Sequence, residues 1–170
     1  MKRIAKFEKV SFEQYKKDFQ KIFGDVYNEE NLKEIYDAIE LPTRSTSGSA
    51  GYDFKSPMTL YVHKIEPIII PTGIRAKMDD GWVLSLYPRS GWGFKYGMHL
   101  CNTVGIIDSD YYDSDNEGHI MAKIEYCYGD FTLEIKQGTG FMQGIFTEYG
   151  ITTDDNADNI RNGGFGSTDK

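Results

Sequence analysis

The sequence contains little cysteine: among its 170 residues only Cys101 and Cys127 are thiols. Two cysteines without CxxC spacing exclude a disulfide-framed scaffold and a cysteine-based zinc site. We therefore expect both thiols to remain reduced in the protein core.

Long hydrophobic runs are also missing. No stretch approaches the roughly 18 to 20 apolar residues that are needed to cross a bilayer. The first ten residues carry basic side chains, but the apolar segment of a secretory signal does not follow them. These absences predict a cytoplasmic protein without membrane contact.

Positive charge is in deficit, since 26 Asp and Glu outnumber 19 Lys and Arg and leave a net charge of -7. Such a surface repels a nucleic-acid backbone, so we expect no nucleic-acid partner. An anionic small substrate would instead need local cations, and a metal ion, to screen its phosphates.

The residues that are present predict one mostly β domain over residues 1–170. A hydrophobic fraction of 39% and an aromatic fraction of 14% are typical of a globular chain that is rich in strands. The first ten residues alternate loosely and predict a short strand. After residue 42, short apolar runs between Gly, Pro and Asp predict an all-β sandwich or barrel. These runs are 59–62, 67–71, 82–87, 120–128, 131–135 and 141–147.

Helical spacing interrupts this pattern early in the chain. Apolar residues recur at helical intervals after Ser11, which forms a plausible capping box with Gln14. A second helix is predicted over residues 29–39, with Asn28 as its cap. Residues 11–39 thus predict a helical hairpin inserted after the first strand, and its simplest interpretation is a packing embellishment.

Two glycine-rich segments can bring backbone N–H groups onto phosphate oxygens. In residues 88–93, Arg89 can fork onto a phosphate, Ser90 can donate its hydroxyl, and Gly91 allows close approach. The second segment, 161–168, belongs to a polar stretch over 152–170 whose composition predicts a mobile tail. Taken alone, the first segment is more typical of an ordinary turn, and the second of a flexible end, than of a phosphate site.

An acidic segment invites a metal interpretation. Asp113, Asp115 and Glu117 match the opening of an EF-hand loop, but Ile124 stands where the closing bidentate Glu is required. A solvated hairpin loop is therefore the better interpretation of residues 113–117.

Asp108 differs from these acidic neighbours because it directly follows the apolar run 105–107. Partial desolvation makes a carboxylate a better proton acceptor. Its position therefore suits Asp108 to deprotonating a water molecule.

Five segments, taken in order, resemble the five motifs of the trimeric dUTPase family. Each is weak alone, but their correct order leaves little room for chance. The resemblance implies an all-β fold of the distorted jelly-roll or β-clip type, a dUTPase-like barrel. It also implies a homotrimer with shared active sites that hydrolyses dUTP to dUMP and pyrophosphate. The segments are 42–44 with 50–54, 88–91, 105–111, 138–143 and 161–168.

The resemblance also implies roles for particular residues. Asp108 would be the general base that activates water for attack on the α-phosphorus, with Gln143 holding that water and Asp53 in a supporting polar network. Mg²⁺ would be held by the triphosphate and by water rather than directly by the protein. The residues that would bind substrate are Arg89, Ser90, Gly91, Asn102, Gly105, Ile106, Ile107, Tyr111, Met121, Arg161, Phe165, Gly166, Ser167 and Thr168.

Selectivity for deoxyuridine follows from the same resemblance. A hairpin around residues 102–108 would pair with the uracil edge and exclude the thymine methyl group. Tyr111 would pack under the deoxyribose and leave no room for a 2′-hydroxyl. The tail would close over the nucleotide of a neighbouring subunit, with Phe165 on uracil and Arg161 among the outer phosphates.

The sequence departs from the family pattern at three places, two of them within motifs. The last motif is one residue shorter between Arg161 and Gly163, which puts the reach of Arg161 in question. In the fourth motif, residues 139–142 stand before Gln143, where the family pattern usually has a charged pair. Extra polar residues at 113–117 lengthen a hairpin.

Two other functions stay open at this point. A dCTP deaminase-like enzyme shares the fold, but it would require a Glu base and would not carry a glycine-rich closing tail. A regulatory protein with the dUTPase fold would use residues 11–39 to hold a protein partner. Asp108 and Gln143 favour an enzyme over a purely regulatory role.

Overall fold

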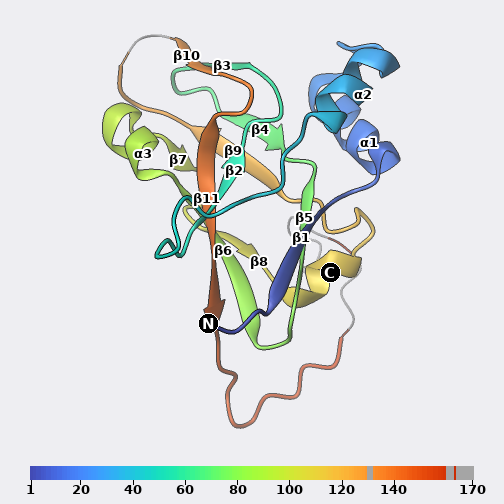
Figure 1. The fold of residues 1–170 in the computed structure, drawn as a ribbon, viewed down its shortest axis with the longest axis vertical. Coiled ribbons are helices and arrows are strands. Elements are labelled where there is room, and N and C mark those ends of the chain that lie inside the picture. Colours follow the sequence, from blue (N-terminus) through green and yellow to red (C-terminus); the bar gives the residue numbers. More distant parts are fainter. Residues whose placement is uncertain (130–131, 160–162, 164–170) are drawn as a thin grey trace.

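The computed structural model describes residues 1–129, 132–159 and 163 (Figure 1). Two helices follow the first strand, and most of the remaining elements are short strands. In chain order the elements are β1 (Ala5–Lys9), α1 (Phe12–Phe23), α2 (Glu29–Asp37), β2 (Tyr52–Lys55), β3 (Leu60–His63), β4 (Ile68–Pro71), β5 (Ile74–Met78), β6 (Trp82–Pro88), α3 (Ser90–Tyr96), β7 (His99–Leu100), β8 (Gly105–Ile107), the 3-10 helix η1 (Ser109–Asp113), β9 (Met121–Glu125), β10 (Thr132–Ile135) and β11 (Gly140–Glu148).

Within the described residues, the strands pair into four antiparallel sheets. The largest has the order β2-β11-β6-β8, and a three-stranded sheet has the order β4-β9-β7. Strands β10 and β3 form one two-stranded sheet, and β1 and β5 form the other. This architecture confirms the all-β prediction, because each of the six predicted apolar runs contains a strand.

The sequence patterns missed strands β2, β5, β7 and β8. In β5, buried Ile74, Ala76 and Met78 alternate with Arg75 and Lys77. This alternation is the ordinary signal of a strand with one buried face, so it could have revealed β5. The other three strands have two to four residues, which is too short for an alternation to stand out.

The predicted run 120–128 is shorter as a strand than expected. Strand β9 ends at Glu125. Beyond it, the backbone N–H groups of Cys127 and Tyr128 both donate to the Tyr96 carbonyl, at 3.1 and 2.8 Å. The chain therefore leaves the sheet in order to bond to the end of α3.

The core lies where the largest sheet meets the elements around it. Strands β2, β6 and β11 contribute Phe54, Leu84, Leu86, Phe141 and Met142, all at most 2% exposed. Burying side chains of this size is the main favourable contribution to folding. The two thiols are not part of this core, because Cys101 is exposed and Cys127 is half-buried. The prediction of core cysteines was therefore wrong for Cys101.

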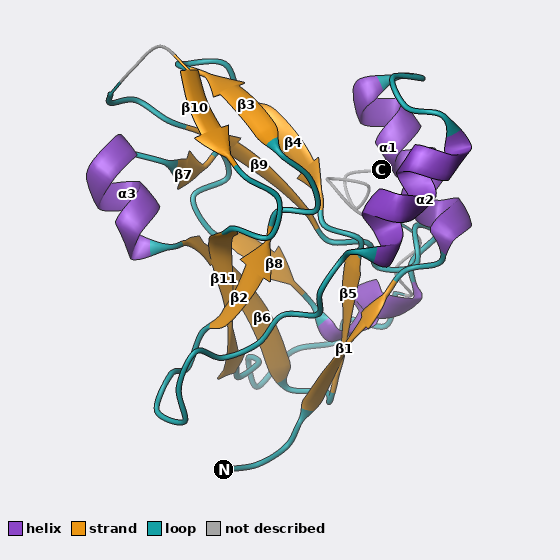
Figure 2. Cartoon of the chain, turned by 45° about the horizontal axis from the view of Figure 1, so that its top comes forward, coloured by secondary structure: helices purple, strands orange, loops and turns teal. Residues whose placement is uncertain are grey.

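Helices α1 and α2 form the predicted hairpin and lie side by side at the edge of the molecule, away from α3 (Figure 2). The Asn28 side chain accepts from the Asn31 N–H at 2.8 Å, so the predicted cap of the second helix is confirmed. Helix α2 ends at Asp37, two residues before the predicted end. Within the described part of the chain, no helix is long and apolar enough to cross a membrane.

The predicted capping box at the start of α1 is half correct. The Ser11 hydroxyl accepts from the Gln14 N–H at 3.1 Å, as expected. The Gln14 side chain does not return to the Ser11 N–H, because it donates to Asp18 at 2.8 Å. Glu117, from the segment predicted to be a solvated loop, accepts from the Ser11 N–H at 2.7 Å instead.

Candidate active site

The segment around Arg89 begins a helix, although its glycines suggested an ordinary turn. Arg89 is the N-cap of α3, and Ser90 is its first residue. The Trp92 indole N–H donates to the Gly140 carbonyl at 2.8 Å, which ties α3 to the start of β11. Ser90 and Gly91 are exposed at the open end of this helix, where a ligand can reach them.

Three predicted site residues come together beside this helix start. Arg89 Nε lies 3.2 Å from Asp53 Oδ1. Gln143 stands opposite Asp53 on one side of β11 and opposite Tyr87 on the other. We call Asp53, Arg89, Ser90 and Gln143 the cationic half-site.

Hydrogen bonds fix the side chains of the cationic half-site. The Ser45 hydroxyl donates to Asp53 Oδ2 at 3.0 Å, a contact that the sequence patterns missed. Arg89 Nη1 donates to the Gly140 carbonyl at 3.4 Å, and Gln143 Nε2 donates to the Pro88 carbonyl at 3.3 Å. The Arg89 side chain remains 42% exposed, so its guanidinium is held in place and still reachable by an anion.

Two glycines make room for this arrangement. A Cβ at Gly51 would meet the Gln143 amide oxygen far inside van der Waals contact. A Cβ at Gly140 would lie 2.5 Å from Arg89 Nη1. A side chain at either position would displace the Gln143 amide or the Arg89 guanidinium, which pass directly over the backbone there.

Asp108 lies in a different part of the same sheet. Strand β8 pairs with β6 so that Ile107 stands opposite Leu84, and the same register continued past the end of β8 puts Asp108 beside Val83. Asp108 then serves as the N-cap of η1, and its carbonyl accepts from the Tyr111 N–H at 3.2 Å. We call residues 105–108 together with Tyr111 the base half-site.

The predicted hairpin around residues 102–108 is a turn between two sheets. Strand β7 pairs with β9, whereas β8 pairs with β6. The turn between them includes Thr103 at φ 68°, and Asn102 is exposed. Gly105 is buried and Ile106 is exposed, and Met121 stands at the start of β9 opposite Pro71.

Tyr111 is largely enclosed by its own chain. Its side chain is 5% exposed, and its hydroxyl donates to the His119 carbonyl at 2.9 Å. The same hydroxyl accepts from Asn116 Nδ2 at 2.8 Å. The placement of Tyr111 under a deoxyribose stays a prediction.

Asp108 and Arg89 lie at opposite ends of β6. Val83, beside Asp108, is six residues from Arg89, which corresponds to about 20 Å along a strand. In Figure 1, α3 and the yellow helical turn after β8 accordingly lie on opposite sides of the molecule. One chain therefore does not bring Asp108 together with Arg89 and Gln143.

Other predicted features add no residue to either half-site. The tail residues Arg161, Phe165, Gly166, Ser167 and Thr168 lie outside the described residues. Over residues 1–129 and 132–159, no three His, Cys, Asp or Glu side chains group as metal ligands would.

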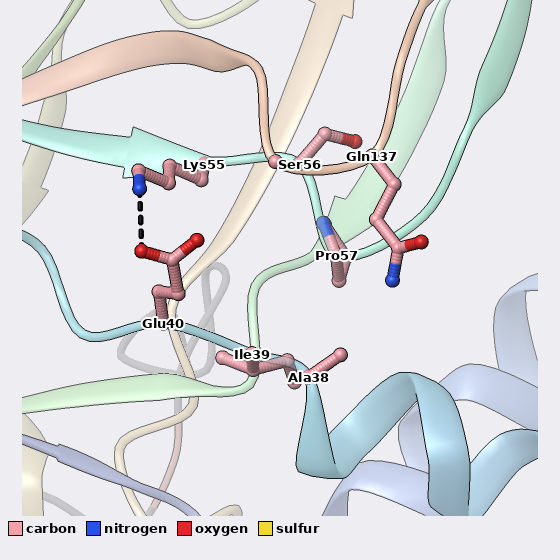
Figure 3. A pocket seen from close by; sticks show the side chains of 8 residues that line it. Ala38, Ile39, Glu40, Lys55, Ser56, Pro57 and Gln137 are labelled. Atoms are coloured by element: carbon pink, nitrogen blue, oxygen red, sulfur yellow. Dashed lines mark hydrogen bonds and ion pairs between the residues drawn. The ribbon is translucent and has the colours of Figure 1, made fainter.

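A shallow pocket lies elsewhere, between the end of α2 and the chain that follows β2 (Figure 3). An ion pair between Glu40 and Lys55 spans it. None of the predicted site residues lines this pocket. Its lining is Ala38, Ile39, Glu40, Lys55, Ser56, Pro57, Gln137 and Gly138.

Comparisons with known proteins agree with the order of motifs and with the fold. A family model described as dUTPase matches residues 37–169. The deoxyuridine 5′-triphosphate nucleotidohydrolase of Lactococcus lactis is 41% identical over 133 residues, which cover 76% of this chain and 88% of the relative. The crystal structure of dUTPase from Streptococcus mutans has a TM-score of 0.62 and 33% identity, with 86% of this chain and 97% of that chain covered.

A more distant structure shares the fold alone. It is a mutant dUTPase from phage phi11 of S. aureus, described with a structural Mg(II) ion. Its TM-score is 0.62 at 16% identity, with 93% of this chain and 99% of that chain covered. Among the functions left open by the sequence, these findings favour the nucleotidohydrolase over the deaminase and the regulatory protein. The chain belongs to the dUTPase family and hydrolyses dUTP to dUMP.

Proposed function

We propose that the enzyme is a homotrimer in which each active site joins the cationic half-site of one subunit to the base half-site of another. The separation of Asp108 from Arg89 along β6 carries this proposal. A general base must lie within about 3 Å of the water it activates, and that water must lie about 3 to 3.5 Å from the atom it attacks. A distance of about 20 Å within one chain is far too long for this geometry. The proposal therefore takes Asp108 from a second chain.

In the proposed reaction, Asp108 takes a proton from water while the water oxygen bonds to the α-phosphorus. The bond from the α-phosphorus to the α,β-bridging oxygen breaks, and pyrophosphate leaves. Gln143 orients the water, because the bond from its amide nitrogen to the Pro88 carbonyl fixes which way its amide oxygen points. Asp53 and the Gly140 carbonyl hold Arg89 through Nε and Nη1, so Nη2 reaches the phosphates.

Mg²⁺ is the proposed cofactor, and the donor set of the chain fits an ion that is carried by the substrate. An ion that takes its oxygen ligands from triphosphate and water needs few ligands from the protein. Among the described residues no three His, Cys, Asp or Glu side chains come together, so the proposal takes the ligands of the ion from substrate and water. When bound, the ion would neutralise the charge that develops on the departing pyrophosphate.

Complementation between two inactive variants tests the shared site. Arg89→Ala damages the cationic half-site, and Asp108→Asn damages the base half-site. In trimers refolded from equal amounts of both, a site is intact only if its cationic half comes from an Asp108→Asn chain and its base half from an Arg89→Ala chain. Each condition holds for about half of the sites, so about one quarter of the sites are intact. We expect activity to return to about this fraction of the wild-type value.

The controls are each variant refolded alone and a mixture of separate homotrimers that is never denatured. Differently tagged chains report whether mixed oligomers form, and light scattering gives their mass. Mixed trimers without recovered activity would contradict the shared site, as would a fully active monomer.

Three other expectations remain predictions. They are the cytoplasmic location, the absence of a nucleic-acid partner, and a protein partner for residues 11–39.

A further inference from the structure

A buried polar network joins α1 to the segment before β9. Asp18, 6% exposed, and His119, 0% exposed, meet through Oδ2 and Nδ1 at 2.7 Å. Gln14 also donates to Asp18 Oδ2, at 2.8 Å. The family model begins at residue 37, so α1 lies outside the part of the chain that matches it.

The hydrogen bonds of His119 define its tautomer. The Gly73 N–H donates to His119 Nε2 at 2.8 Å, so that nitrogen carries no proton. Nδ1 therefore carries the proton and donates it to Asp18. The contact is a hydrogen bond from a neutral ring to a carboxylate, and it fixes both the tautomer and the plane of the ring.

Asp18 is well suited to this role as an acceptor. Burial alone would raise the pKa of its carboxyl group, but the hydrogen bonds from His119 and Gln14 outweigh burial and hold that pKa below its ordinary value. The group is thus ionised at neutral pH, and a charged acceptor makes a stronger hydrogen bond than a neutral one. Removing it would leave the buried Nδ1–H of His119 without a partner.

The network continues from His119 to Tyr111. The backbone carbonyl of His119 accepts from the Tyr111 hydroxyl at 2.9 Å. Asn116 donates to the same hydroxyl, and Ser114 donates to Asn116 Oδ1 at 2.8 Å. The position of the Tyr111 ring therefore depends on where residue 119 is held.

Glu117 provides a second attachment of α1 to the same segment. Its carboxylate accepts from the N–H and the hydroxyl of Ser11, at 2.7 and 2.6 Å. The first helix thus holds this segment at residues 117 and 119, on both sides of Gly118. These two attachments fix the segment that carries the carbonyl acceptor for Tyr111.

We propose that Asp18 is a positioning residue for sugar selection, acting through His119 on the Tyr111 ring. This inference rests on the proposed place of Tyr111 beneath the deoxyribose. A ring displaced by even a fraction of an ångström admits a 2′-hydroxyl more readily, so UTP gains relative to dUTP. The inserted helix is then part of the specificity of the enzyme.

The test is the ratio of kcat/KM for dUTP to kcat/KM for UTP in full-length trimers. We expect Asp18→Ala to lower this ratio about two- to tenfold, the factor that corresponds to one lost hydrogen bond. Tyr111→Phe removes the hydroxyl that contacts His119 and should lower the ratio by a similar factor. The double variant should fall no further than the lower single variant, because both changes break one chain of contacts.

Three variants serve as controls. Asp18→Asn keeps an oxygen acceptor for His119 and should restore most of the ratio. Leu32→Ala loosens the buried face of α2, so it should lower the melting temperature and leave the ratio unchanged. Asp18→Leu fills the same space without an acceptor and replaces the alanine variant if that variant fails to assemble.

The outcomes separate this inference from the sugar contact on which it rests. If Tyr111→Ala leaves the ratio unchanged, Tyr111 does not contact the sugar, and the sugar contact and the positioning role both fail, while the shared site proposed above is unaffected. If Tyr111→Ala changes the ratio and a folded Asp18 variant without an acceptor does not, only the positioning role is overturned. Additive effects in the double variant would overturn it as well.

Discussion

The contact between Glu117 and Ser11 gives a stability prediction that the structure makes quantitative. Glu117→Ala removes the acceptor of the Ser11 N–H and the acceptor of its hydroxyl. Losing a capping interaction costs about 0.5 to 2 kcal/mol. Ser11 is exposed, so water replaces part of the loss. We therefore expect Glu117→Ala to lower the free energy of unfolding by about 1 kcal/mol.

The backbone at Glu117 allows the cap and the local strain to be measured separately. Its φ is 57°, in the left-handed region where a side chain is unfavourable and glycine is not. Glu117→Gly also loses the cap, but it relieves this strain. The glycine variant should therefore be more stable than the alanine variant by about 0.5 to 1 kcal/mol.

The same contact has a defined pH dependence. Burial alone raises the pKa of Glu117, but the hydrogen bonds from Ser11 outweigh it and hold the pKa below its ordinary value of 4.5. A group with a depressed folded pKa stabilises the protein fully above its unfolded pKa, and this contribution is lost as the pH falls through the folded value. The difference between wild type and Glu117→Ala should thus be constant near neutral pH and shrink in acid.

Urea unfolding at equal protomer concentration measures all three effects, since oligomer stability depends on concentration. A cost below about 0.3 kcal/mol for Glu117→Ala would show that the contact contributes nothing measurable. A glycine variant less stable than the alanine variant would refute the strain argument.

Three further changes have defined outcomes. Asp108→Asn should lower kcat at least tenfold and leave nucleotide affinity within a few-fold, as steady-state kinetics and calorimetry would reveal, because a base acts in the transition state. Ending the chain after Ile160 should leave a folded trimer that binds dUTP and turns it over slowly. Turnover at the full rate would show that the tail has no part in catalysis. Thermal unfolding checks that the shortened chain is folded. Tyr15→Phe should be neutral or stabilising by up to about 1 kcal/mol in urea unfolding, because its buried hydroxyl has no hydrogen-bond partner among the described residues; a clear loss would reveal a partner for that hydroxyl.

Local sequence signals predicted the elements that local physics decides. The apolar runs became strands because each has a buried face, and Asn28 capped α2 because its side chain reaches only three residues along the chain. The start of α3 shows the limit of such signals. Glycines around Trp92 indicated a turn, yet the indole bond to Gly140, 48 residues away, helps to hold a helix there.

Long-range contacts explain what the sequence could not predict about the site. The partner of Ser11 is 106 residues away, and the partner of Asp18 is 101 residues away. No periodicity reports contacts at such separations, so the hairpin was interpreted as a packing embellishment. The resemblance implied a supporting polar role for Asp53 and phosphate binding by Arg89, but it did not predict that these two side chains meet. Nor did the order of the motifs predict that Asp108 lies far from Asp53 and Arg89 within one chain. That distance depends on how β8 pairs with β6, and the order of motifs along the chain does not contain this register.

The length of β6 also determines how a damaged gene copy would act beside a normal one. With shared sites, each subunit contributes its Arg89 to one site and its Asp108 to another. A chain that carries changes at both positions therefore spoils two of the three sites in a trimer with two normal chains. When the double variant is expressed alongside the normal chain, the fraction of active sites lost is therefore larger than the fraction of subunits that carry the changes. In an enzyme with self-contained sites, these two fractions would be equal.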